Sequence, residues 1–321
     1  MRARALQRLG HAVKILNLNE CHPENIWARR INNWTGYRLM QQKVGNFISK
    51  RVSTEHYDVA WVDSGPMVGS SIIELLHNSA LKVVNYNNDD PTGGRDGRAW
   101  DTFKAAISSY DLLVTVRRDT ESELKKLGAR RVLRVWMSCD EVEHQQREIT
   151  LADRTIWGSD VVFVGSWMPE RGEFMAALLR SKIPLAIYGN FWNKAAQWTE
   201  IKQAWRGPAI YGDDYAKAIQ CSKIALGLLS RGNRDKHTQR TAEIPALGAL
   251  LCAERTDEHL DLFLEGKEAF FWNDVNECAR TCSELLADED RRRTVAKAGA
   301  RVIAERGLRN EVILSTILRE L

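Results

Sequence analysis

The chain has 321 residues, of which 44% are hydrophobic and 27% are charged, and its formal net charge is +4. This length suits two globular domains of roughly 100–200 residues each. No stretch reaches the roughly 18 uncharged apolar residues that span a membrane, residues 1–11 lack the apolar core of a secretory signal, and the scattered basic charge excludes a nucleic-acid footprint. That charge is compatible with peripheral contact to an anionic membrane surface or to phosphates, and equally with ordinary solvated side chains.

The first part of the chain alternates strand-like apolar runs with helical stretches. The pattern predicts strands over 57–62, 81–86, 112–116 and 131–136, with helices over 70–77, 102–109 and 119–127 between them. This βαβα order predicts a parallel sheet with helices on both faces. Ahead of it, residues 2–9 are helix-like and residues 11–16 are interpreted as a strand. The first strand and Gly-rich loop that normally open a doubly wound domain are therefore missing.

The same rhythm restarts after a polar stretch. The pattern predicts strands over 160–164, 185–188, 224–229 and 250–253, and helices over 172–180, 215–220, 240–247, 275–286, 291–305 and 310–321. We therefore expect an α/β protein with two doubly wound, Rossmann-like domains that face a cleft. The expected divisions are a first domain over 1–142, a linker over 143–158, a second domain over 159–305, and a terminal helix within 306–321 that packs back on the first domain.

Ligands of open α/β sheets bind beyond the carboxyl ends of the strands, so the loops at those ends are the candidate sites. The first strand of the second domain is followed by Gly165, which permits close backbone approach, and by Ser166. Arg171 stands near the start of the next helix. A helix N-terminus attracts a diphosphate, and an arginine adds charge-assisted hydrogen bonds. The alternative is a plain turn with a solvated arginine.

The loop after the strand over 224–229 gathers three cations, Arg231, Arg234 and Lys236, before a helix that Thr238 would cap. Such a cluster suits a pyrophosphate leaving group, whose charge needs fixed positive partners. On the helix, Arg240 precedes Glu243 by one turn. Glu243 can accept hydrogen bonds from both ribose hydroxyls of a nucleotide, or simply pair with Arg240.

Tyr188 ends the strand over 185–188, and Gly189 and Asn190 follow it. These three residues are candidates to contact the base or the sugar. In the first domain, Asp89 and Asp90 follow the strand over 81–86. Either is a candidate catalytic base or a group that stabilises positive charge on the sugar. The alternative is an Asx turn before Pro91.

No metal site is predicted. The two adjacent carboxylates are not interpreted as metal ligands, because the phosphate partners are cationic side chains. The sequence over 288–290 spells a DxD pattern, but its place between two helices favours a helix cap. The six cysteines form no CxxC pair, and Cys278 and Cys282 lie one helical turn apart, as a core stripe or a ligand pair. Reduced thiols in a cytoplasmic protein are expected. The aromatic and basic residues over 22–50 are candidates to bind an acceptor or to pack as an amphipathic helix.

The segment FVGSWMPERG over 163–172 resembles the first strand and loop of the donor domain in group 1 glycosyltransferases. EIPALG over 243–248 is similar to that family's Glu followed five residues later by Gly. The resemblance implies that Glu243 binds the ribose and that Arg171 grips the diphosphate. The sequence departs from the family at two positions: Ser166 stands where the family has an arginine, and Lys236 where it has a second glutamate.

The motifs RGNRD over 231–235, TQR over 238–240 and FLEGKEA over 263–269 resemble the CgeB-like branch, named for a spore maturation protein, over roughly residues 160–305. This resemblance implies a GT-B fold and transfer of a sugar from a nucleotide-sugar donor to a glycan, lipid-linked or protein acceptor. It also implies retention of configuration and no metal or other cofactor. Two alternatives stay open: a GT-B nucleotide-binding or partner protein without activity, and a GT-B nucleotide-sugar epimerase. The oligomeric state is left open.

Overall fold

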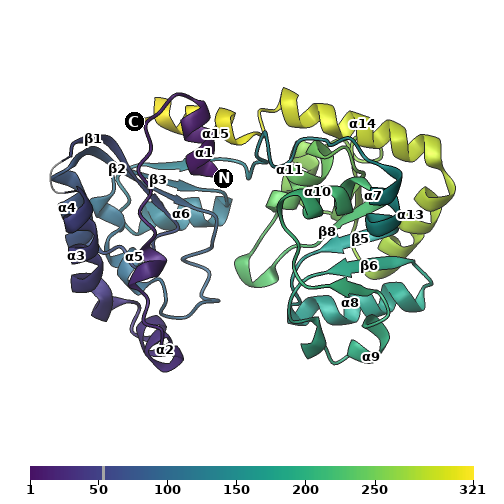
Figure 1. Cartoon of the computed structure of the whole chain (residues 1–321), viewed down its shortest axis with the longest axis horizontal. Coiled ribbons are helices and arrows are strands. Elements are labelled where there is room, and N and C mark those ends of the chain that lie inside the picture. Colours follow the sequence, from purple (N-terminus) through teal and green to yellow (C-terminus); the bar gives the residue numbers. More distant parts are fainter. Residues whose placement is uncertain (53–54) are drawn as a thin grey trace. The chain divides into compact units, whose positions relative to one another are not determined.

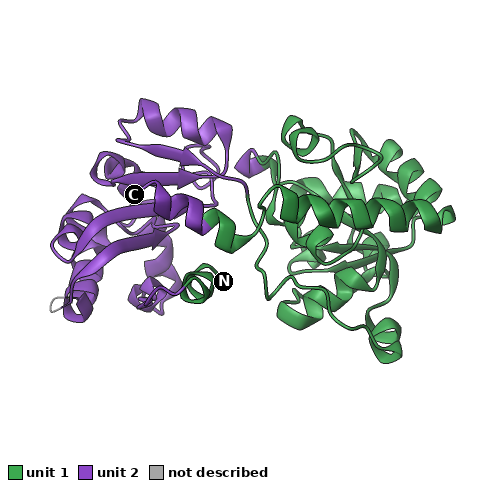
Figure 2. Ribbon diagram, turned by 90° about the horizontal axis from the view of Figure 1, so that it is seen from above, with its two compact units in different colours: residues 1–9, 137–231, 235–313 green, residues 10–136, 232–234, 314–321 purple. Residues whose placement is uncertain are grey.

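The computed structural model describes residues 1–52 and 55–321 and divides them into two compact units. Unit 1 contains residues 1–9, 137–231 and 235–313, and unit 2 contains residues 10–136, 232–234 and 314–321 (Figure 2). Each unit has a parallel sheet and a hydrophobic core of its own.

The sheet of unit 2 has four parallel strands in the order β1-β2-β3-β4. They are β1 (Tyr57–Asp63), β2 (Ala80–Asn87), β3 (Leu112–Thr115) and β4 (Val132–Arg134). The register pairs Trp61 with Val84, and Val84 with Leu112. The order follows the chain, as expected when each crossover carries the chain to the neighbouring strand.

The helices of unit 2 follow the predicted rhythm. They are α2 (Ile26–Trp34), α3 (Gln41–Val52), α4 (Ser70–His77), α5 (Asp101–Ala105) and α6 (Arg118–Lys126), with short 3-10 turns η1 (Leu18–Cys21), η2 (Arg38–Met40) and η3 (Ile107–Ser109). The apolar sides of α3 and α4 bury Val44, Ile48 and Ile72 in the core of this unit. α2 contributes no apolar side chain to it, because its one buried residue is Asn32.

The predicted strand over residues 11–16 is wrong. This stretch has no ladder partner among the described strands, and its residues are exposed or half-buried. Apolar alternation alone does not make a strand, because a strand also needs a neighbour for its backbone hydrogen bonds.

The sheet of unit 1 has six parallel strands in the order β10-β9-β8-β5-β6-β7. They are β5 (Ser159–Val164), β6 (Leu185–Tyr188), β7 (Trp205–Gly207), β8 (Ser222–Gly227), β9 (Leu251–Glu254) and β10 (Phe270–Trp272). The chain goes outward from β5 through β6 to β7 and then returns to β8 on the other side. β5 and β8 are therefore adjacent, and the loops that follow them leave the same edge of the sheet at the point where the strand order reverses.

Helices cover both faces of this sheet (Figure 1). They are α7 (Leu151–Trp157), α8 (Pro169–Arg180), α9 (Trp198–Ile201), α10 (Gly212–Gln220), α11 (Gln239–Ala246), α12 (Asp257–Leu262), α13 (Val275–Ala287) and α14 (Glu289–Glu305), with η4 (Trp192–Lys194) as a 3-10 turn. Unit 1 also contains α1 (Arg2–Arg8), whereas η5 (Arg231–Asn233) and α15 (Asn310–Arg319) each have residues in both units. α8 contacts α9 and α13, whereas α10 contacts α7.

Local chemistry fixes several of these helix ends. Pro169 occupies the first turn of α8, where a missing N–H costs nothing. Asp288 accepts from the backbone N–H of Arg291 at 2.9 Å and so caps α14, as the position of this DxD-like sequence between two helices predicted. Within the stretch expected to be a linker, Thr150 and Asp153 form a capping box that starts α7.

Among the residues that the structure describes, no helix is both long and apolar enough to cross a lipid bilayer.

Candidate functional site

The carboxyl edge of the unit 1 sheet holds most of the predicted donor-site residues. Gly165 and Ser166 follow β5, Gly189 and Asn190 follow β6, and the loop over 228–238 follows β8. The structure thus brings these loops to one edge of one sheet, where ligands of such folds bind.

Arg171 is the central cation of this edge. It lies in the first turn of α8, is 7% exposed, and turns back over the loop that precedes its helix. Its Nη1 donates to the carbonyl of Ser166 at 2.8 Å, and its Nη2 donates to the carbonyl of Leu229 at 3.3 Å. One guanidinium therefore joins the loop after β5 to the loop after β8.

No carboxylate among the described residues forms an ion pair with Arg171, although the charges of Glu170, Glu254 and Asp235 raise its pKa, and its Nε–H is buried without a hydrogen-bond partner. Burial lowers the pKa of the guanidinium, because desolvation disfavours its charged form. Buried polar groups in proteins are almost always paired, and an unpaired one requires an explanation. A bound anion would satisfy both the spare donor and the charge.

Gly165 is required for this packing. A Cβ on Gly165 would lie 2.7 Å from the ring of Phe163 and 3.5 Å from Nη1 of Arg171. The Phe163 ring also lies 5.4 Å from the guanidinium carbon, so the arginine covers an aromatic face. A side chain at position 165 would push the loop away from the cation.

Two more predicted cations lie on the loop after β8. Arg231 and Lys236 are exposed, and neither has a carboxylate partner among the described residues. The backbone of Arg231 donates to Glu170 Oε1 at 3.3 Å, which ties this loop to the start of α8. Both side chains remain available to a ligand.

Thr238 precedes α11 as predicted, and its backbone N–H donates to the Thr241 hydroxyl at 3.0 Å. The imidazole of His259 contacts that hydroxyl through Nε2 at 2.9 Å and the Glu254 carbonyl through Nδ1 at 2.6 Å. The Nδ1–H therefore donates to the carbonyl, and Nε2 accepts from Thr241. Burial holds the pKa of His259 at about 4, so the ring is neutral at physiological pH.

Glu243 is buried and already has protein partners. Its Oε2 accepts from the Tyr215 hydroxyl at 2.9 Å and from Arg240, and its Oε1 faces His144 Nε2 at 3.4 Å. The Nδ1 of His144 accepts from the backbone of Asp140, so its Nε2 carries the proton that faces Glu243. The Arg240 pair that the sequence offered as an alternative is therefore present. A ribose hydroxyl would have to use Oε1, the oxygen of Glu243 with hydrogen-bonding capacity to spare.

Arg234 does not join this group. It belongs to unit 2, where its guanidinium donates to both oxygens of Asp90 at 2.6 and 2.8 Å and to both oxygens of Glu123 at 2.8 and 2.7 Å. Two carboxylates neutralise the cation. The diphosphate role predicted for Arg234 is therefore not supported by its surroundings.

The carboxylate of Asp90 already has several hydrogen-bond partners in unit 2. Its side chain is fully buried, and it accepts from Thr92 and Thr120 at 3.1 Å each in addition to Arg234. Burial opposes ionisation, but Arg234 outweighs it and lowers the pKa of Asp90. A Cβ on Gly93 would lie 2.1 Å from Asp90 Oδ2, so the chain passes directly over the carboxylate. These contacts favour a structural role for Asp90 over the predicted role of catalytic base.

Asp89 is the more available of the two predicted acids. It is half-buried, and its carboxylate is 3.4 Å from the Ser64 hydroxyl. Its backbone N–H donates to Asn87 Oδ1 at 2.8 Å, which is the Asx turn that the sequence offered as an alternative. The turn and a chemical role for Asp89 are compatible, because the turn uses only the backbone of Asp89.

A small aromatic cavity of about 290 Å³ lies after β6. Gly189 and Asn190 line it, and Asn190 Oδ1 also accepts from the backbone of Ala209 at 3.1 Å. Tyr188 does not line it, because its ring is buried beside Trp157. Phe191, which the sequence analysis did not single out, lines the cavity and is 57% exposed with a positive φ of 66°.

Sequence reasoning also missed the side chains that hold the loop after β8. His237 Nδ1 lies 2.5 Å from Glu258, and His237 Nε2 accepts from the backbone of Met137 at 3.0 Å, both in the interior of unit 1. His144 and Tyr215 were missed in the same way. A histidine beside Lys236 is a weak signal by itself, since its partners are distant in the sequence.

The only group of His, Cys, Asp and Glu side chains among the described residues whose ligand atoms lie close enough to hold a metal is a thiol cluster. Cys252, Cys278 and Cys282 have ligand atoms within 4.8 Å of one another and are fully buried in the unit 1 core. Three thiols suit soft metals rather than Mg²⁺. All six cysteines are free.

The comparisons with known proteins address this same half of the chain. Residues 171–313 match the glycosyl transferase-like family. The match covers α8 to α15 and includes Arg171, Arg231, Lys236 and Glu243. No curated protein matches the chain.

Solved structures similar to this one cover nearly the whole chain. Sucrose-phosphate synthase from Thermosynechococcus elongatus has a TM-score of 0.70 at 11% identity, over 99% of this chain and 91% of that protein. HepE from Anabaena in complex with UDP-glucose has a TM-score of 0.63 at 12% identity, over 86% of this chain and 82% of HepE. Trehalose 6-phosphate synthase from Burkholderia multivorans has a TM-score of 0.60 at 10% identity, over 88% and 74%.

The fold is that of the GT-B glycosyltransferases, with two Rossmann-like domains. The predicted fold class is confirmed. At these identities the structural likeness concerns the fold alone, so the chemistry of this chain is argued from its own residues.

Proposed function

We propose that this protein is a glycosyltransferase whose unit 1 binds the diphosphate of a nucleotide-sugar donor. The observation that carries the proposal is Arg171, a buried guanidinium with no carboxylate partner among the described residues and with an unpaired Nε–H. It lies in the first turn of α8, where the helix dipole favours an anion, and its own backbone N–H donates to the Met168 carbonyl at 2.9 Å. The glycosyl transferase-like match begins at this residue.

Arg231 and Lys236 complete the proposed diphosphate site. Both are exposed, and both lie on the loop that Arg171 joins to the loop after β5. When the bond to the sugar breaks, negative charge builds up on the departing diphosphate, and fixed cations stabilise it. The cations supply that charge without a metal, so we propose that transfer needs neither a metal nor another cofactor.

We propose that the nucleoside extends from this site along the same edge. The cavity after β6 offers the exposed ring of Phe191 to a nucleobase, with Gly189 and Asn190 beside it. Glu243 Oε1, which faces only His144, is the atom that a ribose hydroxyl would use. The Anabaena protein HepE, which shares the fold, was crystallised with UDP-glucose, and this supports a nucleotide sugar as the donor.

For the acceptor side we propose Asp89 as the group that removes a proton or stabilises positive charge on the sugar. Asp90 instead holds Arg234. The proposal that the configuration is retained rests on the resemblance to group 1 enzymes, and so does membership of the CgeB-like branch. Because disulfides are rare in reducing compartments, the six free cysteines support the proposed cytoplasmic location.

Turnover of nucleotide sugars tests the proposal. Purified protein is incubated with a panel of donors, with and without candidate glycan, lipid-linked and protein acceptors, and release of nucleoside diphosphate is measured. We expect release from at least one donor, stimulated by an acceptor, and reduced at least about a hundredfold in Arg171→Met. Nucleotide binding without turnover of any donor would favour the inactive binding protein, and conversion of the donor sugar to an isomer would favour the epimerase.

A matched control separates the loss of charge from a general effect of removing a buried arginine. Arg292 in α14 is similarly buried and donates to the backbone carbonyls of Leu285 and Leu286. Arg292→Met should therefore leave turnover close to that of the parent protein, whatever it does to stability.

A further inference from the structure

Helix α2 in unit 2 leaves most of its apolar surface in solvent. Ile26, Trp27, Ile31 and Trp34 are between 52% and 68% exposed, and Leu39 just beyond the helix is 69% exposed. A short surface helix normally buries an apolar stripe against its own domain. Here the only buried residue of the helix is Asn32, so packing within unit 2 does not account for these side chains.

The exposed residues form one stripe rather than a scatter. Trp27, Ile31 and Trp34 follow the spacing of three, four and seven that places residues on one face of a helix, and Ile26, eight positions before Trp34, lies beside them. Arg30 lies on the same face, with its guanidinium carbon 5.0 Å from the centre of the Trp27 ring. Asn25 caps the helix by accepting from the backbone of Trp27 at 2.8 Å, so the stripe is held in helical register.

The surrounding segment is strongly basic. Residues 22–51 contain six Lys and Arg residues and one acid, Glu24, a formal charge of +5, against +4 for the whole chain. Arg29, Arg30 and Arg38 have no carboxylate partner among the described residues. An exposed apolar stripe beside uncompensated arginines is the composition of a helix that lies in the interface of an anionic bilayer.

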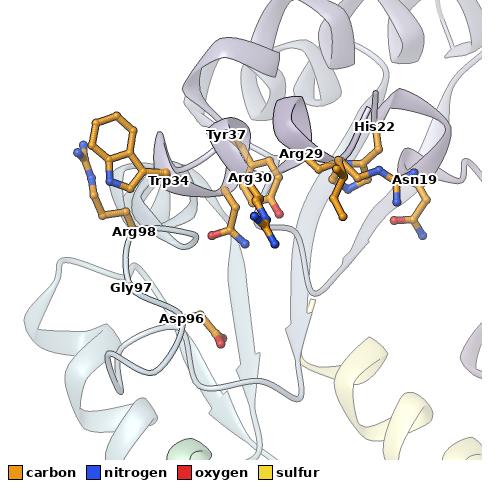
Figure 3. A pocket seen from close by; sticks show the side chains of 11 residues that line it. Asn19, His22, Arg29, Arg30, Trp34, Tyr37, Asp96, Gly97 and Arg98 are labelled. Carbon is orange, nitrogen blue, oxygen red and sulfur yellow. The ribbon is translucent and has the colours of Figure 1, made fainter. Parts of the chain in front are cut away.

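A pocket of about 690 Å³ lies beside the stripe (Figure 3). Arg29, Arg30, Trp34 and Tyr37 line one side, and the loop with Asp96 and Arg98 lines the other. Asp96 is already paired with Arg95. His22, which also lines the pocket, keeps its Nδ1 buried without a hydrogen-bond partner. Arg29 donates its Nε–H to the Pro23 carbonyl at 2.7 Å, and the remaining N–H groups of Arg29 and Arg30 are donors to an anion in this pocket.

We propose that the face formed by Ile26, Trp27, Arg30, Ile31, Trp34 and Leu39 docks on an anionic membrane surface, and that the pocket beside it receives a lipid headgroup phosphate. The apolar side chains enter the headgroup region, where tryptophan is favoured, while the arginines meet the phosphates. A protein partner with an acidic surface would use the same tryptophan and arginine side chains, and absence of binding to anionic vesicles is the outcome that favours such a partner. The inference stands on unit 2 alone and does not depend on the donor chemistry proposed for unit 1.

Vesicle flotation tests the docking. The full-length protein is mixed with vesicles of phosphatidylcholine alone or of phosphatidylcholine with phosphatidylglycerol, at low salt and at about 0.15 M salt, where charges are screened beyond about 8 Å. We expect binding to the anionic vesicles only, weakened by salt. The double variant R29E/R30E should bind at least about thirtyfold more weakly, from the attraction of an anionic surface for each basic residue. W27A/W34A should also lose binding, at either salt concentration.

Matched controls come from the same unit. K126E/R130E changes the net charge by the same amount at exposed positions far from α2 in the sequence, and L81A/L127A removes two other exposed apolar side chains. Both should bind vesicles like the parent protein. Equal losses in these controls, binding unchanged in R29E/R30E, or no binding to anionic vesicles would each overturn the proposal. It would also be overturned if soluble glycerol phosphate bound as tightly as the vesicles, since that would indicate a site for a free phosphate.

Discussion

Individual side chains in this protein divide into those that hold the structure and those left with capacity for a ligand. Asp90 and Arg234 belong to the first kind, because each satisfies the other and both are surrounded by further partners. Arg171 belongs to the second, because no carboxylate among the described residues forms an ion pair with it and its Nε–H has no hydrogen-bond partner. The number of partners therefore separates two arginines that the sequence assigned to the same role.

The pair of acids after β2 gives a first prediction. Asp90→Asn removes a charge that Arg234 needs, and we expect the free energy of unfolding to fall by about 2 kcal/mol, below the usual cost of a broken buried pair because Glu123 remains. Urea unfolding measures this. Asp213→Asn, which breaks the exposed pairs of Asp213 with Arg147 and Lys217, should cost less than about 1 kcal/mol.

Asp89→Asn, unlike Asp90→Asn, should affect turnover more than stability. Because the half-buried carboxylate of Asp89 has no cationic partner among the described residues, we expect unfolding to change little. Turnover of the donor should fall by about a hundredfold or more if Asp89 acts in proton transfer or charge stabilisation. An active Asp89→Asn variant would return the choice of catalytic group to other residues of unit 2.

The buried imidazole of His259 predicts a dependence of stability on pH. Its pKa is about 4 in the folded protein, against an ordinary value of 6.5. The unfolded chain therefore takes up a proton first as the pH falls, and this stabilising contribution is present above about pH 6.5 and lost towards pH 4. From about pH 7 to about pH 5, the free energy of unfolding should fall by about 2 kcal/mol on account of His259.

The measurement is urea unfolding at several pH values for the parent and for His259→Asn, whose amide can still donate to the Glu254 carbonyl. The variant should lack the His259 part of the pH dependence, while His144, whose pKa is also lowered by burial, contributes to both proteins. Identical pH dependence in the two proteins would rule out this assignment.

At the scale of elements, the site depends on loops that pass very close to one another. A Cβ on Gly189 would lie 2.0 Å from the carbonyl oxygen of Gly165. Gly189 also has a φ of +156°, which side chains rarely adopt. The loop after β6 thus supports the loop that carries Arg171 towards its ligand.

Gly189→Ala should therefore lower both the melting temperature and the affinity for a nucleoside diphosphate. Gly207 is a matched control, because its φ is +159° but nothing lies within 4 Å of its missing Cβ. Both variants pay a backbone cost of roughly 1–3 kcal/mol, and only Gly189→Ala adds the clash. Thermal unfolding with and without nucleotide compares them. Equal effects of the two substitutions would mean that the contact with Gly165 does not matter.

Much of the element order could be predicted from sequence, because the long strands and helices carry a clear period. The strands around 57–62, 81–86 and 160–164 are confirmed. β7 and β10, at three residues each, were missed, whereas the equally short β4 lies within the longer strand-like run predicted over 131–136. The roles of the site residues were harder to predict from sequence. Arg234 pairs with a residue 144 positions away, and no local sequence pattern indicates such a partner.

At the scale of the whole molecule, the two units present different chemistry. In unit 1 we propose an anion site at the loops after β5 and β8, and unit 2 has a basic, aromatic face and a half-buried acid. The central claim concerns the first of these, the diphosphate site at Arg171.

Isothermal titration of the parent protein, Arg171→Met and Arg292→Met with UDP and with uridine tests this claim most directly. We expect the parent and Arg292→Met to bind UDP far more tightly than uridine. Arg171→Met should bind UDP about tenfold to a hundredfold more weakly, because charge-assisted hydrogen bonds to the diphosphate are lost, and should bind uridine as before. UDP affinity that is unchanged in Arg171→Met, or equal affinities of the parent for UDP and uridine, would contradict the account.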